Sequence, residues 1–300
     1  MTTSQMALFA EEPVMTADDP TNLVDNADVI LVNSSGGKDS QAMAAYVKAL
    51  AEQVGAVDRI MVLHCDLGRV EWKGTREIAE LQAARLGLRF EVRSRGKGDL
   101  IEQIEERGMF PSADVRYCTS YHKREIARGV IRDFDSRYAR NWRRGLVLNC
   151  LGNRAAESSK RVRQLPLSVD TAVSTRGRSV YTWLPIHSWS DARVWQRIAD
   201  SGLPYSPVYD EGMSRLSCSF CVLANEADLI CAARLRPDMA KVYVDLEADI
   251  GHQFKPDLAM ADVYAQAQAL GPPRPGVRGT AMRRHLGDEV TDTYLRRLAA

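Results

Sequence analysis

The sequence of 300 residues contains no long apolar run: no segment approaches the roughly 18 uncharged apolar residues that a membrane span requires. It also has no excess of one charge, because 40 Lys and Arg residues balance 39 Asp and Glu residues and leave a net charge of +1. An overall field that attracts nucleic acid is therefore excluded, and any such binding needs a local patch. The N-terminal residues are acidic and lack the basic and apolar regions of a signal peptide, so we expect a cytoplasmic protein with no membrane partner.

Histidine and cysteine are also scarce, with five and six residues respectively. Six cysteines in a cytoplasmic chain of this length do not indicate a disulfide framework, so we expect metal or redox chemistry of those that cluster. Cys218 and Cys221 form a C-x-x-C pair, a spacing typical of redox pairs, of half a zinc site or of part of an iron–sulfur site. No histidine lies within this loop, which argues against zinc.

The chain does contain alternating strand and helix patterns from residue 27 onward. We expect strands at 29–32, 60–64, 89–92 and 146–151, and helices at 41–54, 73–86, 99–107, 123–134 and 190–201. This alternation predicts an α/β, Rossmann-like parallel sheet with helices on both faces. Ligands of such sheets bind at the carboxyl ends of the strands, where residues 34–40, Asp66 and residues 152–161 are expected to lie.

Three regions are expected along the chain. Residues 1–26 are polar and predict a flexible lead-in, and residues 27–224 predict one nucleotide-binding domain that includes the C-x-x-C loop. Residues 225–300 predict a mostly helical C-terminal region, broken at Pro237, at Pro256 and at 271–275. Within the central domain the chain is expected to become irregular from Tyr181, except for the helix at 190–201.

The segment from Ser35 to Ser40 (S-G-G-K-D-S) follows the first expected strand and opens the first long helix. Gly36 and Gly37 let the backbone approach a ligand closely and direct successive N–H groups into one concavity. The helix N-terminus and Lys38 add positive charge, and the two serine hydroxyls add donors. The pattern predicts a polyphosphate site. It is not a Walker loop, because that motif has four residues between its glycines.

This loop resembles the PP-loop of the ATP pyrophosphatase superfamily, whose HUP-type members cleave ATP between the α- and β-phosphates or bind a nucleotide cleaved there. Three further blocks resemble the phosphoadenosine phosphosulfate (PAPS) reductase family within that superfamily. They are the R-x-C-T block at 116–119 with Lys123, the G-x-R-x-x-E-S-x-x-R block at 152–161, and the segment from Trp183 through the C-x-x-C pair. The resemblance runs in order from residue 28 to residue 224.

The resemblance implies a set of nucleotide-binding residues, namely Ser35, Gly36, Gly37, Lys38, Asp39, Ser40, Asp66, Gly152, Arg154, Glu157 and Arg161. Arg154 and Arg161 can bind phosphate or sulfate oxygens through two parallel N–H groups, and Glu157 could orient one of them. The alternative is a solvated, salt-bridged helix face. Asp66 could coordinate Mg²⁺ or accept a hydrogen bond from the nucleotide, and its alternative role is to form a turn.

The resemblance also implies that Cys118, Cys218, Cys221 and Cys231 bind a [4Fe–4S] cluster beside the nucleotide. For Cys231 the alternative is a buried helix residue, since free cysteine packs as a small hydrophobe. The chain departs from the reductases because no cysteine follows Cys231, so the nucleophile of their E-C-G-[IL]-H motif is missing. Tyr117 also stands where adenylyl-sulfate reductases have a second cysteine. The chain is therefore most similar to the DNA phosphorothioation sulfurtransferases of the DndC type.

That resemblance implies that ATP and Mg²⁺ bind at the loop, that an acceptor oxygen is adenylated with release of pyrophosphate, and that sulfur then replaces the activated oxygen. The implied catalytic residues are Lys38, Asp39, Arg154 and Arg161, with Mg²⁺ held by the phosphates and by Asp39 or Asp66. A cysteine desulfurase is the implied sulfur donor. Two alternatives stay open: a reductase of adenylyl sulfate or phosphoadenylyl sulfate in sulfur assimilation, and a catalytically inactive nucleotide-binding regulator.

DNA is the implied acceptor, ahead of tRNA. Residues 137–144 contain four arginines around Tyr138 and Trp142, a pattern typical of nucleic-acid binding. A solvated helix end before the strand at 146–151 is the alternative. The oligomeric state is left open, with a dimer as one option.

Overall fold

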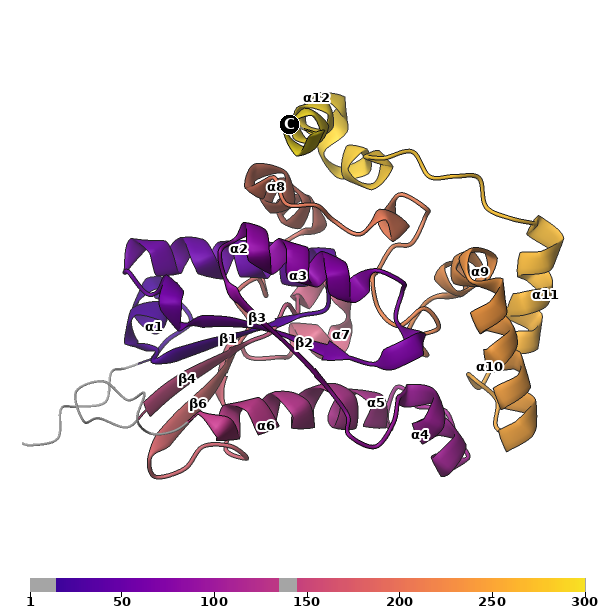
Figure 1. Ribbon diagram of the computed structural model, residues 1–300, viewed down its shortest axis with the longest axis horizontal. Coiled ribbons are helices and arrows are strands. Elements are labelled where there is room, and N and C mark those ends of the chain that lie inside the picture. Colours follow the sequence, from indigo (N-terminus) through magenta and orange to yellow (C-terminus); the bar gives the residue numbers. More distant parts are fainter. Residues whose placement is uncertain (1–14, 135–144, 300) are drawn as a thin grey trace, which may run out of the picture.

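A six-stranded sheet forms the centre of the computed structural model, which describes residues 15–134 and 145–299 (Figure 1). The strand order is β3-β2-β1-β4-β6-β5. The first five of these strands are parallel, and β5 pairs with β6 in the antiparallel direction. The strands are β1 Val29–Ser34, β2 Ile60–Asp66, β3 Arg89–Ser94, β4 Gly145–Cys150, β5 Leu167–Val169 and β6 Arg178–Trp183.

Helices follow most of the strands and then make up the C-terminal region. They are α1 Pro20–Asn26, α2 Lys38–Gln53, α3 Thr75–Arg85, α4 Leu100–Arg107, α5 Tyr117–Thr119, α6 Glu125–Asp133, α7 Ser159–Val162, α8 Asp191–Ser201, α9 Glu226–Leu235, α10 Pro237–Ile250, α11 Met260–Leu270 and α12 Thr280–Ala299. Among the described residues, no helix combines the length and the apolar composition needed to cross a membrane.

The alternation of side chains along β1 assigns the helices to two faces of the sheet. Ile30 and Val32 belong to a core that includes buried residues of α1, α2, α8 and α12, whereas Val29 and Leu31 belong to a core with α6. Figure 1 shows α2 and α3 on one side of the strands and α6 on the other. Because both faces are covered, the central strands are apolar on both sides. The predicted α/β, Rossmann-like fold is confirmed.

Helix α1 corrects the prediction of a flexible lead-in up to residue 26. Pro20 occupies its first turn, and the Asp19 carboxylate accepts a hydrogen bond from Asn22 N at 2.9 Å, so two N-terminal helix signals are present. Leu23 and Val24 are fully buried in the core beneath α2. The prediction failed because a seven-residue helix shows no clear period, and such a short helix gains its stability from tertiary packing.

Strand β6 corrects the prediction of irregular chain from Tyr181, because it continues to Trp183, and the short strand β5 was not predicted. β6 is paired along its whole length with β4, and Trp183 stands opposite Cys150. The sequence around β6 is polar, and Pro185 follows it closely, so the pattern did not indicate a strand. The parallel sheet that was predicted has one antiparallel strand at its edge, where β5 pairs with β6.

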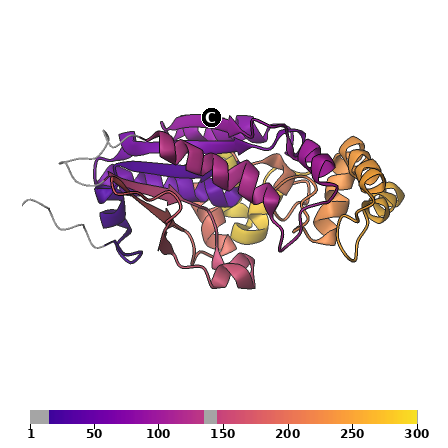
Figure 2. The same ribbon diagram turned by 90° about the horizontal axis from the view of Figure 1, so that it is seen from below.

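The helices α9, α10 and α11 stand at the carboxyl ends of the strands, as both views show (Figures 1 and 2). They share a core with Leu67 and Val70, which follow β2, and with Phe110. Arg236, between α9 and α10, donates to the carbonyl oxygen of Arg69 at 3.1 Å and to Ser219 Oγ. The C-terminal helices therefore complete the domain rather than pack as a separate core.

Helix α12 returns across the molecule and packs on α8 (Figure 1). Tyr294 OH donates to the carbonyl oxygen of Leu203 at 2.8 Å, and Tyr294 lies in the same core as α2 and α8. The last helix of the chain is thereby fixed over the first half of the sheet domain.

Replacing Leu23 with alanine tests whether α1 belongs to the folded domain. Leu23 is fully buried, so Leu23→Ala is expected to lower the free energy of unfolding by about 2–5 kcal/mol. The matched variant Leu165→Ala changes a leucine that is 69% exposed, and its effect should stay within about 0.5 kcal/mol. Urea unfolding followed by circular dichroism measures both. Equal effects of the two variants would show that α1 adds nothing to the core.

Candidate active site

The loop 35–37 lies between β1 and α2, at the point where the strand order reverses between β1 and β4. Ligands of open α/β sheets bind at such a switch point. Gly36 has a left-handed backbone (φ 70°), and a Cβ there would lie 2.9 Å from the carbonyl oxygen of Thr75. A Cβ on Gly152, just after β4, would lie 3.2 Å from the backbone nitrogen of Ser40. Both glycines therefore permit close backbone approach around the start of α2.

The amide groups of this loop donate to hydroxyls. Ser35 N donates to Ser40 Oγ at 3.2 Å, Gly36 N to Ser34 Oγ at 3.2 Å, and Lys38 N to Tyr209 OH at 2.9 Å. A hydroxyl is a weaker acceptor than an ionised phosphate oxygen, so a phosphate group could replace these partners with a gain in hydrogen-bond strength. The first turn of α2 also directs its positive end toward this loop.

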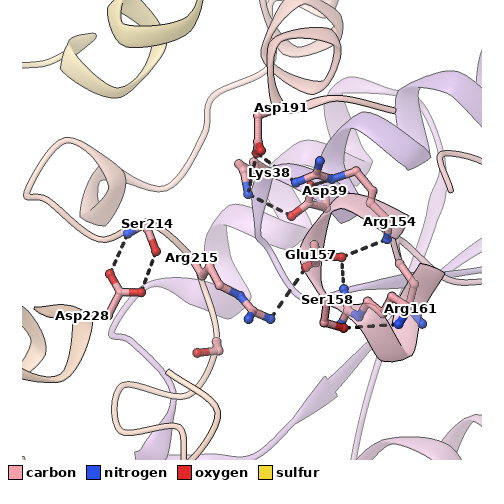
Figure 3. Close-up of polar contacts among 12 residues, drawn as sticks. Lys38, Asp39, Arg154, Glu157, Ser158, Arg161, Asp191, Ser214, Arg215 and Asp228 are labelled. Atoms are coloured by element: carbon pink, nitrogen blue, oxygen red, sulfur yellow. Dashed lines mark hydrogen bonds and ion pairs between the residues drawn. The ribbon is translucent and has the colours of Figure 1, made fainter. Parts of the chain in front are cut away.

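A buried guanidinium, that of Arg154, ties the phosphate loop to the start of α8 (Figure 3). The residue is only 2% exposed. Its Nε donates to Asp39 Oδ1 at 2.6 Å, its Nη2 to Asp191 Oδ1 at 2.9 Å and its Nη1 to the carbonyl oxygen of Trp189 at 3.1 Å. Lys38 Nζ lies 3.1 Å from Asp39 Oδ2 and 3.6 Å from Asp191 Oδ1. Two cations and two carboxylates thus balance one another beside the loop.

The same balance of charges affects the pKa of Asp191. Its partial burial would raise the pKa of the carboxyl, but Arg154 and Lys38 favour the ionised form more strongly and hold the pKa below its usual value. Asp191 is therefore ionised at neutral pH. Its position as the first residue of α8 follows from Ser190, whose side chain accepts from Arg193 N and caps the helix.

The carboxylate of Glu157, which follows β4 in the sequence, interacts with a second group of cations. Its Oε2 accepts from Arg154 N at 2.9 Å and pairs with Arg161 Nη1, and its Oε1 lies 3.7 Å from Arg215 Nη2. Figure 3 shows Arg161 and Arg215 approaching this carboxylate from different sides. Two guanidinium groups thus share one carboxylate, which leaves an excess of positive charge.

This excess acts on Arg161. Burial lowers the pKa of its guanidinium, and the positive charges of Arg215, Arg116 and Arg154 lower it further, to about 10, against the opposing effect of Asp39. Arg116 belongs to the block that carries the first predicted cluster cysteine, so this block also lies near Arg161. The alternative of a solvated helix face does not describe this group, because Arg154 is buried and Arg161 is partly buried.

A buried histidine connects the phosphate loop to the cysteines. His64, at the end of β2, has Nδ1 3.0 Å from the carbonyl oxygen of Ser34 and Nε2 3.2 Å from Glu71 Oε2. A carbonyl only accepts, so Nδ1 carries a proton, and a second proton on Nε2 satisfies the Glu71 carboxylate. Burial lowers the pKa of His64, but the hydrogen bond and the charge of Glu71 raise it by more, so that it lies above its ordinary 6.5.

Three of the predicted cluster cysteines lie close together. Burial, against the opposing charge of Lys123, together with Cys221, Glu71 and Cys118, raises the pKa of the Cys218 thiol to about 12. Burial and then Cys221 also raise the pKa of Cys118. Lys123 shows the complementary effect: loss of hydration lowers the pKa of its ammonium, but Cys218, Glu71, Cys221 and Cys118 together raise it by more. Lys123 is nevertheless exposed to solvent, so this group of side chains lies close to the surface.

Backbone contacts fix the cysteine loop at this place. Ser219 N donates to the carbonyl oxygen of Val70 at 2.9 Å, which ties the loop to the segment after β2. On the other side, a Cβ on Gly37 would lie 3.2 Å from Leu216 Cβ, so the same loop touches the phosphate loop. A π-helical turn at Ser120–Arg124 joins α5 to α6 and carries Lys123 between the cysteine block and the sheet.

Cys231 lies apart from the group formed by Cys118, Cys218 and Cys221. Its Sγ donates to the carbonyl oxygen of Glu211 at 3.5 Å, and the charges that act on it are those of Asp228, Arg234 and Glu211 rather than those of other thiols. The residue is partly buried in α9, as its alternative role requires. The structure therefore gathers three of the four predicted cluster cysteines.

The remaining two cysteines lie in or beside the sheet. Cys150 is fully buried at the end of β4. Cys65 follows His64, and its Sγ lies 3.8 Å from the carbonyl oxygen of Lys123. Burial raises the pKa of the Cys65 thiol to about 12, so it is protonated and a poor nucleophile at neutral pH.

The donor set decides which metal group could fit here. Within residues 15–134 and 145–299, no three His, Cys, Asp or Glu side chains are arranged to hold a metal ion. A single zinc ion would need its sulfur ligands within about 2.3 Å of one centre. An iron–sulfur cluster is bound by cysteine thiolates and, because it is larger, spreads its ligands farther apart. Three neighbouring thiols beside a lysine therefore fit a cluster in donor chemistry and in charge.

Two predicted features stay predictions. Asp66 Oδ1 accepts from Gly68 N at 2.8 Å, which is its turn-forming role, and its contact with Mg²⁺ or nucleotide is untested. The basic and aromatic stretch at 137–144 lies outside the described residues, so its role in nucleic-acid binding is untested as well.

The residues gathered at this edge of the sheet fall within a single family match. The phosphoadenosine phosphosulfate reductase domain matches residues 29–224. This range includes the phosphate loop, the cysteine loop and the arginine cluster, which consists of Arg116, Arg154, Arg161 and Arg215. The chain belongs to the PAPS reductase family.

Two curated relatives of this PAPS reductase-family chain are described as uncharacterized proteins. A protein of Methanocaldococcus jannaschii is 28% identical over 218 residues, which are 73% of this chain and 47% of that protein. A 37.8 kDa protein of Escherichia phage 186 is 27% identical over 165 residues, which are 54% of this chain and 47% of that protein. The chain thus spans about half the length of these relatives.

Two solved structures show a distant likeness in fold. The U34-tRNA thiolase NcsA of Methanococcus maripaludis, solved with its [4Fe-4S] cluster, has a TM-score of 0.44 and 11% identity, over 84% of this chain and 78% of that one. The PAPS reductase of Candida auris has a TM-score of 0.43 and 14% identity, over 66% and 87% of the two chains. At these values neither likeness bears on function.

Sequence reasoning assigned no role to five residues of the site: His64, Glu71, Asp191, Tyr209 and Arg215. A histidine two positions before Asp66 at a strand end was a usable signal for the first. The others lie in loops or at a helix start, and their roles depend on partners that are distant in sequence. Tyr209 and Lys38, for example, are 171 positions apart.

The His64–Glu71 pair is expected to make stability depend on pH. Because the folded pKa of His64 is raised, its stabilising contribution is present below the unfolded pKa of about 6.5 and is lost as pH rises through the folded pKa. Glu71→Gln removes this contribution. The difference in free energy of unfolding between wild type and Glu71→Gln should therefore be larger at about pH 6 than at about pH 9.

Urea unfolding at the two pH values measures this difference, and Glu80→Gln, which changes an exposed glutamate of α3, is the matched control. The Glu80→Gln difference should stay near zero at both. A Glu71→Gln difference that does not vary with pH would contradict the assignment of a charged His64–Glu71 pair.

Proposed function

We propose that this protein is a PP-loop enzyme that binds ATP and activates an oxygen of an acceptor by adenylation, with release of pyrophosphate. Sulfur would then replace the adenylated oxygen, which leaves with AMP, and a [4Fe–4S] cluster held by the chain would supply the sulfur chemistry, as the resemblance to DndC-type sulfurtransferases implies. The acceptor is proposed to be DNA, ahead of tRNA, and the sulfur donor a cysteine desulfurase. The family membership supports an enzyme of this superfamily, and the finer assignments are our proposal.

The observation that carries the proposal is the contact between the phosphate loop and the cysteine loop. Leu216 packs against Gly37, and the hydrogen-bonded path from Ser34 through His64 to Glu71 ends near Cys218. A nucleotide on the loop and a group held by the cysteines would therefore occupy adjoining parts of one edge of the sheet. An enzyme that only binds nucleotide has no need of a group of thiols beside the phosphate loop.

The chain's own residues suit the adenylation step. The loop amides and the N-terminus of α2 would hold the phosphates. As the acceptor oxygen bonds to the α-phosphorus, the bond from that phosphorus to the bridging oxygen breaks, and negative charge develops on the pyrophosphate. Lys38 and Arg161 would stabilise this charge. Arg154 is enclosed by Asp39, Asp191 and a carbonyl, so its role is to hold the acids and Lys38 in position.

The reaction also depends on two bound groups, Mg²⁺ and the iron–sulfur cluster, which the chain would hold but does not itself contain. Mg²⁺ would be bound by the phosphates and by Asp66, because Asp39 is already paired with Lys38 and Arg154. Cys118, Cys218 and Cys221 would hold the cluster, which supplies the sulfur chemistry when it is bound. Lys123, which faces these thiols, would offset their negative charge as thiolates.

The reductase alternative receives no support from the thiols. It needs a cysteine that can attack sulfur, and the raised pKa of Cys65 leaves that thiol protonated at neutral pH. Cys231 is likewise partly buried, and its pKa is raised by burial.

Lys38→Ala tests the nucleotide site. Removing a charge-assisted contact worth about 1.5–3 kcal/mol should weaken ATP binding by about tenfold or more and abolish ATP–pyrophosphate exchange. Lys97→Ala, which changes an exposed lysine after β3, should bind ATP as the wild type does. Calorimetry and isotope exchange are the measurements. Wild-type affinity in Lys38→Ala would remove the basis of the proposal.

Iron analysis tests the cluster. Protein purified without oxygen should contain about four iron and four sulfide ions per chain, and Cys118→Ala and Cys221→Ala should lose most of both. Cys231→Ala should keep the wild-type content, because Cys231 lies apart from the other three. Zinc in the wild-type protein, or equal iron loss in Cys231→Ala, would contradict the assignment of these ligands.

A further inference from the structure

Arg215 belongs to the cysteine loop in sequence but to the arginine cluster in space. It precedes Cys218 by three positions. Its side chain nevertheless reaches toward the segment after β4, where Nη2 lies 3.7 Å from Glu157 Oε1 (Figure 3). Its charge acts on Arg161 and on the phenol of Tyr209, the group that accepts from Lys38 N. Arg215 is therefore close both to the other residues of the arginine cluster and to the phosphate loop.

The positive charge of the site is not evenly distributed. Lys38 and Arg154 face two carboxylates, and this half of the site is balanced. In the other half, Arg161 and Arg215 share Glu157, and Arg116 lies near them with a hydrogen bond of 3.3 Å to the Thr119 hydroxyl. Among the described residues this half thus gathers three guanidinium groups around one carboxylate.

This second half is also open to solvent. The side chain of Arg161 is 24% exposed and that of Arg215 is 41% exposed, whereas Arg154 is buried. An anion can therefore reach the excess charge. Guanidinium groups bind phosphate oxygens through two parallel N–H groups, and two of them from different segments can enclose one tetrahedral oxyanion.

We propose that Arg161 and Arg215 bind one phosphate-type oxyanion between them, and that Arg215 thereby couples occupancy of the phosphate site to the order of the cysteine loop. The inference rests on the proposed function, because the oxyanion would be a phosphate of the nucleotide or a phosphodiester of the acceptor. Glu157 keeps the two guanidinium groups near each other before the anion binds. Arg215 is a substrate-positioning residue in this scheme.

The cysteine loop is anchored at both ends, so anion binding at Arg215 would order only the short segment between the anchors. Ser214 N and Oγ donate to the Asp228 carboxylate at 2.9 and 2.6 Å, so the residue before Arg215 is anchored to α9 (Figure 3). On the far side, Ser219 is bonded to Val70. An anion that engages Arg215 would therefore restrain the segment 215–218 between two fixed points, immediately beside the first cysteine of the pair.

Hydrogen–deuterium exchange of the 300-residue protein as purified tests this coupling, with inorganic pyrophosphate and a short DNA oligonucleotide as the two probes. In the wild type, one of the probes should slow amide exchange in residues 215–221 by about tenfold. Slowing by pyrophosphate identifies the nucleotide phosphates as the source of the oxyanion, and slowing by the oligonucleotide alone identifies the acceptor.

Arg215→Ala should lose this protection and should bind the effective probe about tenfold more weakly. Arg215→Lys should recover only part of the affinity, since an ammonium cannot make two parallel hydrogen bonds. Arg163→Ala removes an exposed arginine just after α7 and should behave as the wild type.

Two outcomes would overturn the inference: no change of exchange with either probe, or the same protection in Arg215→Ala as in the wild type. The proposed function is judged separately. If the wild type binds no ATP, the proposed function fails. If ATP binds with wild-type affinity in Arg215→Ala and the protection persists, the coupling through Arg215 alone is refuted.

Discussion

The arrangement of this site depends on the burial of one guanidinium group, that of Arg154. A buried charge is tolerated only when it is paired and hydrogen-bonded, and each of the three guanidinium nitrogens of Arg154 donates a hydrogen bond, to Asp39, to Asp191 and to the carbonyl oxygen of Trp189. Its three partners come from α2, from α8 and from the segment before α8. The contacts of this one guanidinium group therefore set the position of the phosphate-loop helix relative to the second half of the domain.

A short segment, residues 209–211, extends this arrangement to the C-terminal chain. Tyr209 OH accepts from Lys38 N, while the Asp210 carboxylate accepts from Gly279 N at 3.0 Å and from Ala281 N at 2.8 Å. Glu211 accepts from Gly276 N at 2.9 Å. Three consecutive side chains thus connect the phosphate loop with the chain that leads into α12. The cysteine loop follows directly after this segment, so it is held in the same framework.

Much of the fold could be predicted because its signals are local. The strand before the loop, the glycines at 36 and 37 and the helix that follows are contiguous, and each has a physical reason readable within a few residues. Helix α1 and strand β6 were missed for the opposite reason. The burial of Leu23 comes from α2 and the sheet, and the pairing of β6 comes from β4, which ends 28 residues before β6 begins at Arg178.

The sequence by itself determined the α/β fold, the phosphate loop, the family blocks and the identity of the candidate cysteines, since all of these are carried by short runs of residues. The tertiary structure decided that Cys118 joins Cys218 and Cys221 while Cys231 does not, that Arg154 is an enclosed structural cation, and that Arg161 and Arg215 share the unbalanced charge. Electrostatic interaction depends on distance through space, and the side chains that set these charges come from segments far apart along the chain.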